Sequence, residues 1–253
     1  MTSTISTTHL TTILQDARSR TLELVSGLDE KQLMGPHIAT VNPLRWEIGH
    51  VAYFYEYFIL RQMYGHESLL GTNADKLYDS IAVTHDTRWD LPLLSTNETL
   101  TYMRNVLDKL CEHLEQNNED SMASKQDSFM FQFGVFHEDM HTEAFTWGRQ
   151  TLAYPTPEFA IAKNITTERT AGPLSGYVDI PGGAFQQGGD PKATFIFDNE
   201  KFSHEVNVEP FSIARAPVTN KEFSIFVDDG GYSNKGLWDE IAWGKMQANG
   251  QKH

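Results

Sequence analysis

The chain has 253 residues, which is long enough for two domains of ordinary size. Its formal net charge of −14 argues against nucleic acid or an anionic membrane surface as a general partner. No apolar run reaches the roughly 20 residues of a membrane-spanning helix, and the first residues do not have the pattern of a secretory signal. A lone cysteine, Cys111, excludes a disulfide framework, so we expect a cytoplasmic protein.

Four amphipathic segments fill the first 150 residues and predict a helical bundle. The first segment runs from about Thr8 to Gly27. The second segment opens with Asn42 as a helix N-cap and Pro43 at the first helical position, and it ends at Gly65.

The third segment begins at Ser95, where Ser95 and Glu98 have the spacing of a capping box. The fourth segment covers about Ser128 to Leu152 and ends before a pair of prolines. The connection 66–94 is longer than bundle loops usually are. It is rich in Trp, Leu and polar side chains, so we expect it to fold over another part of the protein.

The pattern changes after residue 152. A polar stretch at 153–176 indicates a linker, and the short runs that follow it have the alternation of β-strands. Thr219 and Glu222 repeat the capping-box spacing and predict a short helix. The predicted domains are therefore residues 1–152 and 177–253, and the predicted fold class is α+β.

The sequence HEDMHTE, residues 137–143, is the strongest chemical signal. Residues four apart share one face of a helix, so His137 and His141 can reach the same metal ion, although this spacing also occurs on ordinary helix surfaces. His50 lies in an apolar run, where a histidine is often a core residue, but bundles build metal sites from facing helices. Three histidine ligands would leave coordination positions open, as catalysis requires.

Other polar residues near these histidines are weaker candidates for metal ligands. Glu138 points roughly 100° away from His137, and Glu143 lies on nearly the opposite face from His141, so both are expected to form salt bridges or outer contacts. His85, in the long connection, is an alternative third ligand. Three neutral imidazoles suit iron or zinc, and spacing does not choose between them.

Asp86 and Arg88, in the sequence HDTRW, are the next candidates. One interpretation is a salt bridge within the loop. The other is that Arg88 holds a substrate carboxylate or hydroxyl group, because a guanidinium offers a planar fork of donors.

The chain resembles a known family in two places. The sequences PLRWEIGHVAYFYE (43–56) and HEDMHTEAFTWGRQTLAYP (137–155) resemble the DinB-like domain of the ergothioneine-type sulfoxide synthases. The sequences GGAFQQGG (182–189) and FDNEKFSHEVNVEPFSIARAPVTNKEFSIFVDDGGY (197–232) resemble the start of their second domain. The implied fold class is α+β, with a DinB-like four-helix bundle followed by an incomplete formylglycine-generating-enzyme-like (C-type-lectin-like) domain.

The resemblance implies non-haem Fe(2+) held by His50, His137 and His141. It implies an oxidoreductase that uses O2 to form a C–S or C–Se bond at imidazole C2 of hercynine, the trimethylated form of histidine. The implied partners are therefore small molecules, namely hercynine, a sulfur or selenium donor and O2. Neither nucleic acid nor a membrane is expected.

Three features depart from the family pattern. Met140 stands where many members have a glutamine for the histidine-derived substrate, and Arg88 is the only arginine in a loop that usually carries several for γ-glutamylcysteine. With Asp86, they are the substrate-binding candidates, and HDTRW and HEDMH are more similar to the selenoneine-synthase branch, whose donor is a selenosugar. The second domain is expected to be truncated at its C-terminus, with the family's catalytic tyrosine beyond it, so no catalytic residue is assigned.

Two other functions stay open. The same three histidines could hold zinc in a DinB-like thiol transferase or hydrolase, which would prefer zinc and consume no oxygen. Alternatively, the truncated chain could be a non-catalytic metal-binding or interaction protein with a closed coordination sphere.

Overall fold

The computed structural model describes residues 4–116, 121–160 and 173–250. The chain forms two compact units, one of Met1–Ile165 with Gly188–Ser203 and one of Thr166–Gln187 with His204–His253. Within the described ranges, no helix combines the length and the apolar character needed to cross a membrane.

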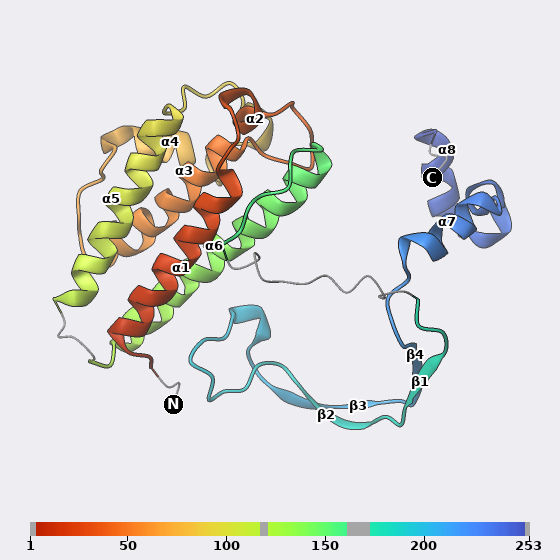
Figure 1. Cartoon of the computed structure of the whole chain (residues 1–253). Helices are drawn as coiled ribbons and strands as arrows, with labels where there is room; N and C mark the ends of the chain where they lie inside the picture. Colours follow the sequence, from red (N-terminus) through yellow and green to blue (C-terminus); the bar gives the residue numbers. More distant parts are fainter. Residues whose placement is uncertain (1–3, 117–120, 161–172, 251–253) are drawn as a thin grey trace. The chain divides into compact units, whose positions relative to one another are not determined.

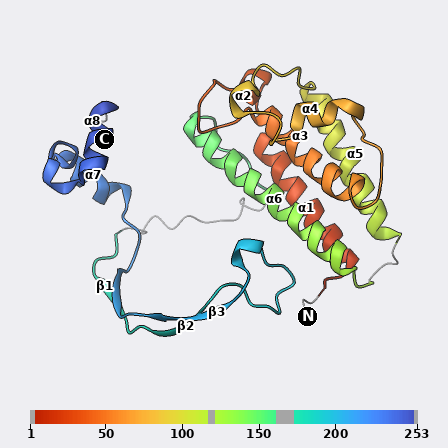
Figure 2. The same cartoon turned by 180° about the vertical axis from the view of Figure 1, so that it is seen from behind.

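Four long helices make up the first unit, as Figures 1 and 2 show. They are α1 (Thr7–Val25), α3 (Leu44–Tyr55), α5 (Thr96–Glu115) and α6 (Lys125–Thr151), and the π-helical turn η1 (Glu56–Arg61) continues α3. The shorter elements are α2 (Glu30–Met34), η2 (Gly71–Asn73), α4 (Ala74–Tyr78) and η3 (His85–Thr87). Each of the four predicted helical segments is confirmed, with its ends shifted by a few residues.

The helix starts show where local sequence rules hold and where they do not. At α5 the predicted capping box is present, with Ser95 Oγ accepting from the Glu98 backbone and the Glu98 side chain accepting from the Ser95 backbone. The predicted Asn42 cap is wrong, because Pro43 occupies the N-cap position of α3 without a side-chain cap. The Asn42 side chain instead donates to Glu47 Oε1 at 2.6 Å.

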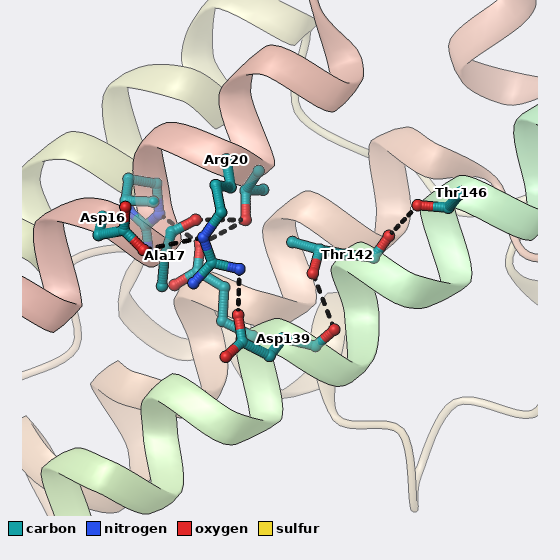
Figure 3. Close-up of polar contacts among 9 residues, drawn as sticks. Asp16, Ala17, Arg20, Asp139, Thr142 and Thr146 are labelled. Carbon is teal, nitrogen blue, oxygen red and sulfur yellow. Dashed lines mark hydrogen bonds and ion pairs between the residues drawn. The ribbon is translucent and has the colours of Figure 1, made fainter. Parts of the chain in front are cut away.

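Helices α1 and α6 are joined by charged side chains as well as by the apolar core. In Figure 3, Arg20 of α1 reaches across to Asp139 of α6, with 2.6 Å between Nη1 and Oδ1. Deeper in the bundle, Arg18 Nε donates to Glu138 Oε1 at 2.9 Å, and these two side chains are only 4% and 1% exposed. Thr21 donates to the same carboxylate oxygen at 2.7 Å. The expectation that Glu138 forms a salt bridge is therefore confirmed.

The long connection 66–94 folds onto α3, as predicted. The indole Nε1 of Trp46 donates to the Leu77 carbonyl at 2.7 Å, and the Tyr78 ring lies directly against Gly49. A Cβ atom at Gly49 would be 2.2 Å from a Tyr78 ring carbon, so only glycine allows this approach. The connection thereby covers the middle of α3.

The segment Gly188–Ser203, which includes the turn η5 (Asp198–Glu200), packs on α6 in the first unit. The Phe195 ring lies 4.8 Å from the Phe136 ring and 5.0 Å from the Phe129 ring, between centroids. The hydroxyl of Thr194 donates to Gln132 Oε1 at 3.2 Å. Residues far along the sequence therefore complete one side of the helical unit.

The second unit contains two antiparallel pairs of strands. Its strands are β1 (Tyr177–Ile180), β2 (Gly183–Gln187), β3 (His204–Val208) and β4 (Phe211–Ala214), with β1 paired to β4 and β2 paired to β3. Between β1 and β2, Gly182 has φ of 76°, and a Cβ there would be 2.4 Å from the Val208 carbonyl oxygen. The turn therefore requires glycine.

Short helices follow the strands of the second unit. They are α7 (Asn220–Asp228), which begins with the predicted Thr219–Glu222 capping box, η6 (Gly231–Ser233), η7 (Lys235–Leu237) and α8 (Glu240–Ala248). Apolar side chains on the strands, such as Phe211 and Ile213, are exposed. Together the two units confirm the predicted α+β fold class.

Candidate metal centre

Three histidines from two helices converge inside the bundle. His50 comes from the middle of α3, and His137 and His141 come from adjacent turns of α6. Each offers one ring nitrogen, and these three atoms lie within 4.8 Å of one another. The ring centroids are 5.2 Å apart for His50 and His137, 5.0 Å for His50 and His141, and 4.7 Å for His137 and His141. The structure thus brings together the three residues that the sequence predicted as ligands.

The orientation of His50 is set by two contacts. Its Nδ1 lies 2.7 Å from the Tyr78 carbonyl oxygen, which can only accept, so Nδ1 carries the proton and Nε2 has the free lone pair. Its ring stacks on Trp46 at 4.8 Å between centroids and 8° between planes. Burial, and then the nearby His141, lower the pKa of His50 to about 4. His50 is therefore a neutral imidazole, and Nε2 is the nitrogen that can bind a metal ion.

His137 is also held as a neutral ring. It stacks on Phe54 with 3.7 Å between centroids and 12° between planes. Burial lowers its pKa to about 2, with smaller contributions from His141 and His50. Its Nδ1 is buried and has no hydrogen-bond partner among the described residues. A bound cation would satisfy such a nitrogen.

A buried carboxylate lies behind His141. Glu47 is on α3, one turn before His50, and its Oε2 atom is 3.9 Å from His141 Nδ1. The other oxygen, Oε1, accepts from Asn42. Neither Glu47 Oε2 nor His141 Nδ1 has a hydrogen-bond partner within the described ranges. A carboxylate in this place can orient the imidazole and increase its basicity as a ligand.

The donor set fits a transition-metal ion. Three imidazoles with converging nitrogens suit iron or zinc. Three protein ligands leave room for further ligands, as in catalytic sites. Glu47 was not among the predicted site residues, because it is far in the sequence from His137 and His141. The three-residue spacing of Glu47 and His50 on one helix face was the signal that could have identified it.

Arg88 packs on the Trp46 ring, which in turn stacks on His50. Its guanidinium carbon is 3.7 Å from the centroid of the Trp46 ring, on which His50 stacks. Nη1 donates to Asn42 Oδ1 at 2.7 Å, and Nη2 donates to the Val83 carbonyl at 3.2 Å. Burial lowers the pKa of Arg88, and Glu47 partly offsets that effect. Through Arg88, the long connection 66–94 contacts Trp46, whose ring stacks on His50.

The remaining predicted site residues are Asp86, His85 and Met140, and none of them belongs to the group of three histidines. Asp86 is 83% exposed and approaches His37 and His85, so its neighbours differ from those in the interpretation of a salt bridge with Arg88. His85 belongs to this separate group and is not the third ligand of the bundle site. Met140 precedes His141 and is 49% exposed.

Comparisons with known proteins agree with this architecture. Residues 13–145 match the DinB superfamily, and residues 162–253 match the sulfatase-modifying factor enzyme 1-like domain. The chain therefore belongs to the DinB superfamily, and its combination of the two domains fits the ergothioneine-type sulfoxide synthase family.

Among its curated relatives are three proteins named hercynine oxygenase. The protein of Mycolicibacterium smegmatis is 30% identical over 92% of this chain and 53% of its own length. The protein of Mycobacterium tuberculosis is 32% identical over 94% of this chain and 54% of its own length. A formylglycine-generating enzyme of Mycobacterium tuberculosis is 41% identical over 23% of this chain and 18% of its own length. The chain spans about half the length of the hercynine oxygenases that it matches.

Proposed function

We propose that this chain is the metal-binding part of a non-haem iron(II)- and O2-dependent oxidoreductase that forms a C–S or C–Se bond at imidazole C2 of hercynine. The observation that carries the proposal is the convergence of three imidazole nitrogens, from His50, His137 and His141, within 4.8 Å of one another. The relatives named hercynine oxygenase support the substrate class. Bound iron would supply open coordination positions at which a sulfur or selenium donor and O2 could meet beside the substrate imidazole.

The protein's own residues would prepare this site. His50 would bind through Nε2, because the Tyr78 carbonyl holds the proton on Nδ1. Glu47 would accept a hydrogen bond from His141 Nδ1–H and hold that ring in place. The stacked rings of Trp46 and Phe54 exclude water on the outer sides of His50 and His137.

We propose three residues as substrate contacts, namely Arg88, Met140 and Asp86. Arg88 carries a guanidinium one layer from the metal site and would bind an anionic or hydroxyl-bearing part of the donor. Met140, immediately before His141, would offer a thioether where many members of the resembled family have an amide. Asp86 is more exposed than either, and its neighbours are His37 and His85.

A zinc-dependent thiol transferase or hydrolase is the second candidate function. The observation that favours it is the same set of three imidazoles, because zinc accepts three such ligands and a water molecule. Oxygen consumption separates the two candidates, since zinc does not undergo redox chemistry.

The testing experiment is anaerobic binding of iron(II) and zinc(II) to the full chain. We expect one tightly bound iron per chain, with an electronic spectrum that changes when hercynine and nitric oxide are added. His50→Ala and His137→Ala should each abolish the tight binding of iron(II), whereas His9→Ala, which removes an exposed imidazole on α1, should not.

Three outcomes would count against the proposal. Tight iron binding that survives His50→Ala would show that the three-histidine site is wrong. Strong zinc preference, without hercynine-dependent oxygen uptake in the presence of iron and a donor, would favour the zinc enzyme. Iron that admits no added ligand would indicate a closed, structural site.

A further inference from the structure

A second group of metal-binding side chains lies at the surface of the first unit. It contains His37, from the loop after α2, and His85 and Asp86, from η3. Asp86 Oδ1 is 3.6 Å from His37 Nε2 and 3.2 Å from His85 Nδ1. Two imidazole nitrogens from different loops therefore face one carboxylate oxygen.

The hydrogen bonds of His85 show which of its ring nitrogens carries a proton. The other ring nitrogen is an acceptor, and it faces Asp86. His85 Nε2 lies 2.9 Å from the Val41 carbonyl oxygen, so Nε2 carries a proton. In the neutral ring, Nδ1 then has a lone pair, and this lone pair faces the Asp86 carboxylate oxygen at 3.2 Å. Two acceptors at this distance repel each other unless a cation lies between them. The geometry therefore calls for a proton or a metal ion at this point.

The two loops are held in place by contacts that leave the donor atoms free. The Trp89 indole nitrogen donates to the carbonyls of Met34 and Gly35 at 3.1 and 3.2 Å. The His37 ring packs on the Trp89 ring with 4.4 Å between centroids. The group is thus preorganised, and binding an ion would order little additional chain.

We propose that His37, His85 and Asp86 form a second metal site, distinct from the three histidines of the bundle. Two imidazoles and one carboxylate suit a divalent ion of the zinc class, with water completing the coordination. Because the site is exposed, the ion exchanges with solvent and serves as a clip between the two loops. The clip restrains the loop that carries Arg88, whose guanidinium covers Trp46 beside His50.

Zinc(II) titration of the full chain tests the site. The wild-type chain is expected to bind two ions of different affinity. His37→Ala and Asp86→Asn should each weaken one of them by at least about tenfold, in line with the losses that follow even from removing outer partners of metal ligands. His9→Ala should leave both unchanged. In a His137→Ala chain only the loop ion should remain tightly bound, which separates this site from the proposed catalytic site.

Cobalt(II) provides a local readout. In the His137→Ala chain it should broaden the indole N–H resonance of Trp89, which is assigned by its loss in Trp89→Phe, and Asp86→Asn should abolish the broadening. If wild type and His37→Ala bind the same number of zinc ions with the same affinities, the proposal is overturned. The cation between His85 and Asp86 is then a proton.

Discussion

Glu47 lies one turn before His50 on α3, and its Oε2 atom faces His141 Nδ1 at 3.9 Å. It is almost completely buried, so its carboxyl oxygens need hydrogen-bond partners close to them. Asn42 donates to one oxygen only, and the other has no hydrogen-bond partner within the described residues. His141 Nδ1–H is the donor closest to this second oxygen, which makes Glu47 a positioning residue for the metal centre.

Glu47→Gln is expected to weaken metal binding by about 10- to 100-fold, the usual effect of removing an outer carboxylate from a ligand histidine. The amide has nearly the same volume, so the fold should be retained. The measurement is competition for iron(II) or zinc(II) against a chelator of known affinity. Glu143→Gln is the matched control, because Glu143 is exposed on the same helix as His141. Equal losses in both variants would remove the special role of Glu47.

At the scale of elements, two ion pairs that differ in burial join helices α1 and α6 among the described residues. Arg18 and Glu138 are almost completely buried, whereas Arg20 and Asp139 are each 35% exposed. Removing one partner of a buried pair leaves the other charge without compensation, and removing a partner of an exposed pair costs little. The two arginines lie two residues apart on α1, so they offer a direct comparison.

Arg18→Met is expected to lower the free energy of unfolding by about 3–5 kcal/mol, because Glu138 would be left buried and unpaired. Arg20→Met should lower it by no more than about 1 kcal/mol. Urea denaturation followed by circular dichroism measures both. The double variant Arg18→Met, Glu138→Leu should recover much of the loss, since no buried charge remains. Similar losses in the two single variants would contradict this account.

At the scale of the whole molecule, the chain forms two compact units, and the three histidines all lie in the first. A ligand that binds only the folded state stabilises the unit to which it binds. The proposed metal should therefore change the stability of the helical unit and leave the strand-containing unit unaffected.

Metal removal is expected to affect the two units differently. With free metal at about 100 times its dissociation constant, the helical unit should gain about 2.7 kcal/mol relative to the metal-free protein. Native-state hydrogen exchange measures this gain as slower exchange of amides in α3 and α6. Amides in the paired strands β1–β4 serve as the internal control and should exchange at the same rate. Uniform slowing over both units would contradict the prediction.

Local patterns in the sequence accounted for much of the architecture. The 3.6-residue period located the four helices, and the capping boxes at Ser95 and Thr219 marked two helix starts, because these features depend on residues within one or two turns. The same locality places His137 and His141 on one face of α6. The Asn42 cap was wrong because Arg88, distant in the sequence, donates to the side-chain oxygen that a cap would use.

The tertiary structure decided which distant groups meet. It placed His50 opposite His137 and His141, set its tautomer through the Tyr78 carbonyl, and brought Glu47 behind His141. It also grouped His37 with His85 and Asp86, and it packed Gly188–Ser203 on α6. The sequence by itself determined helix positions and the spacing of ligands within α6, because these depend on neighbours along the chain. The contacts between elements depend on packing between distant segments, which no local pattern encodes.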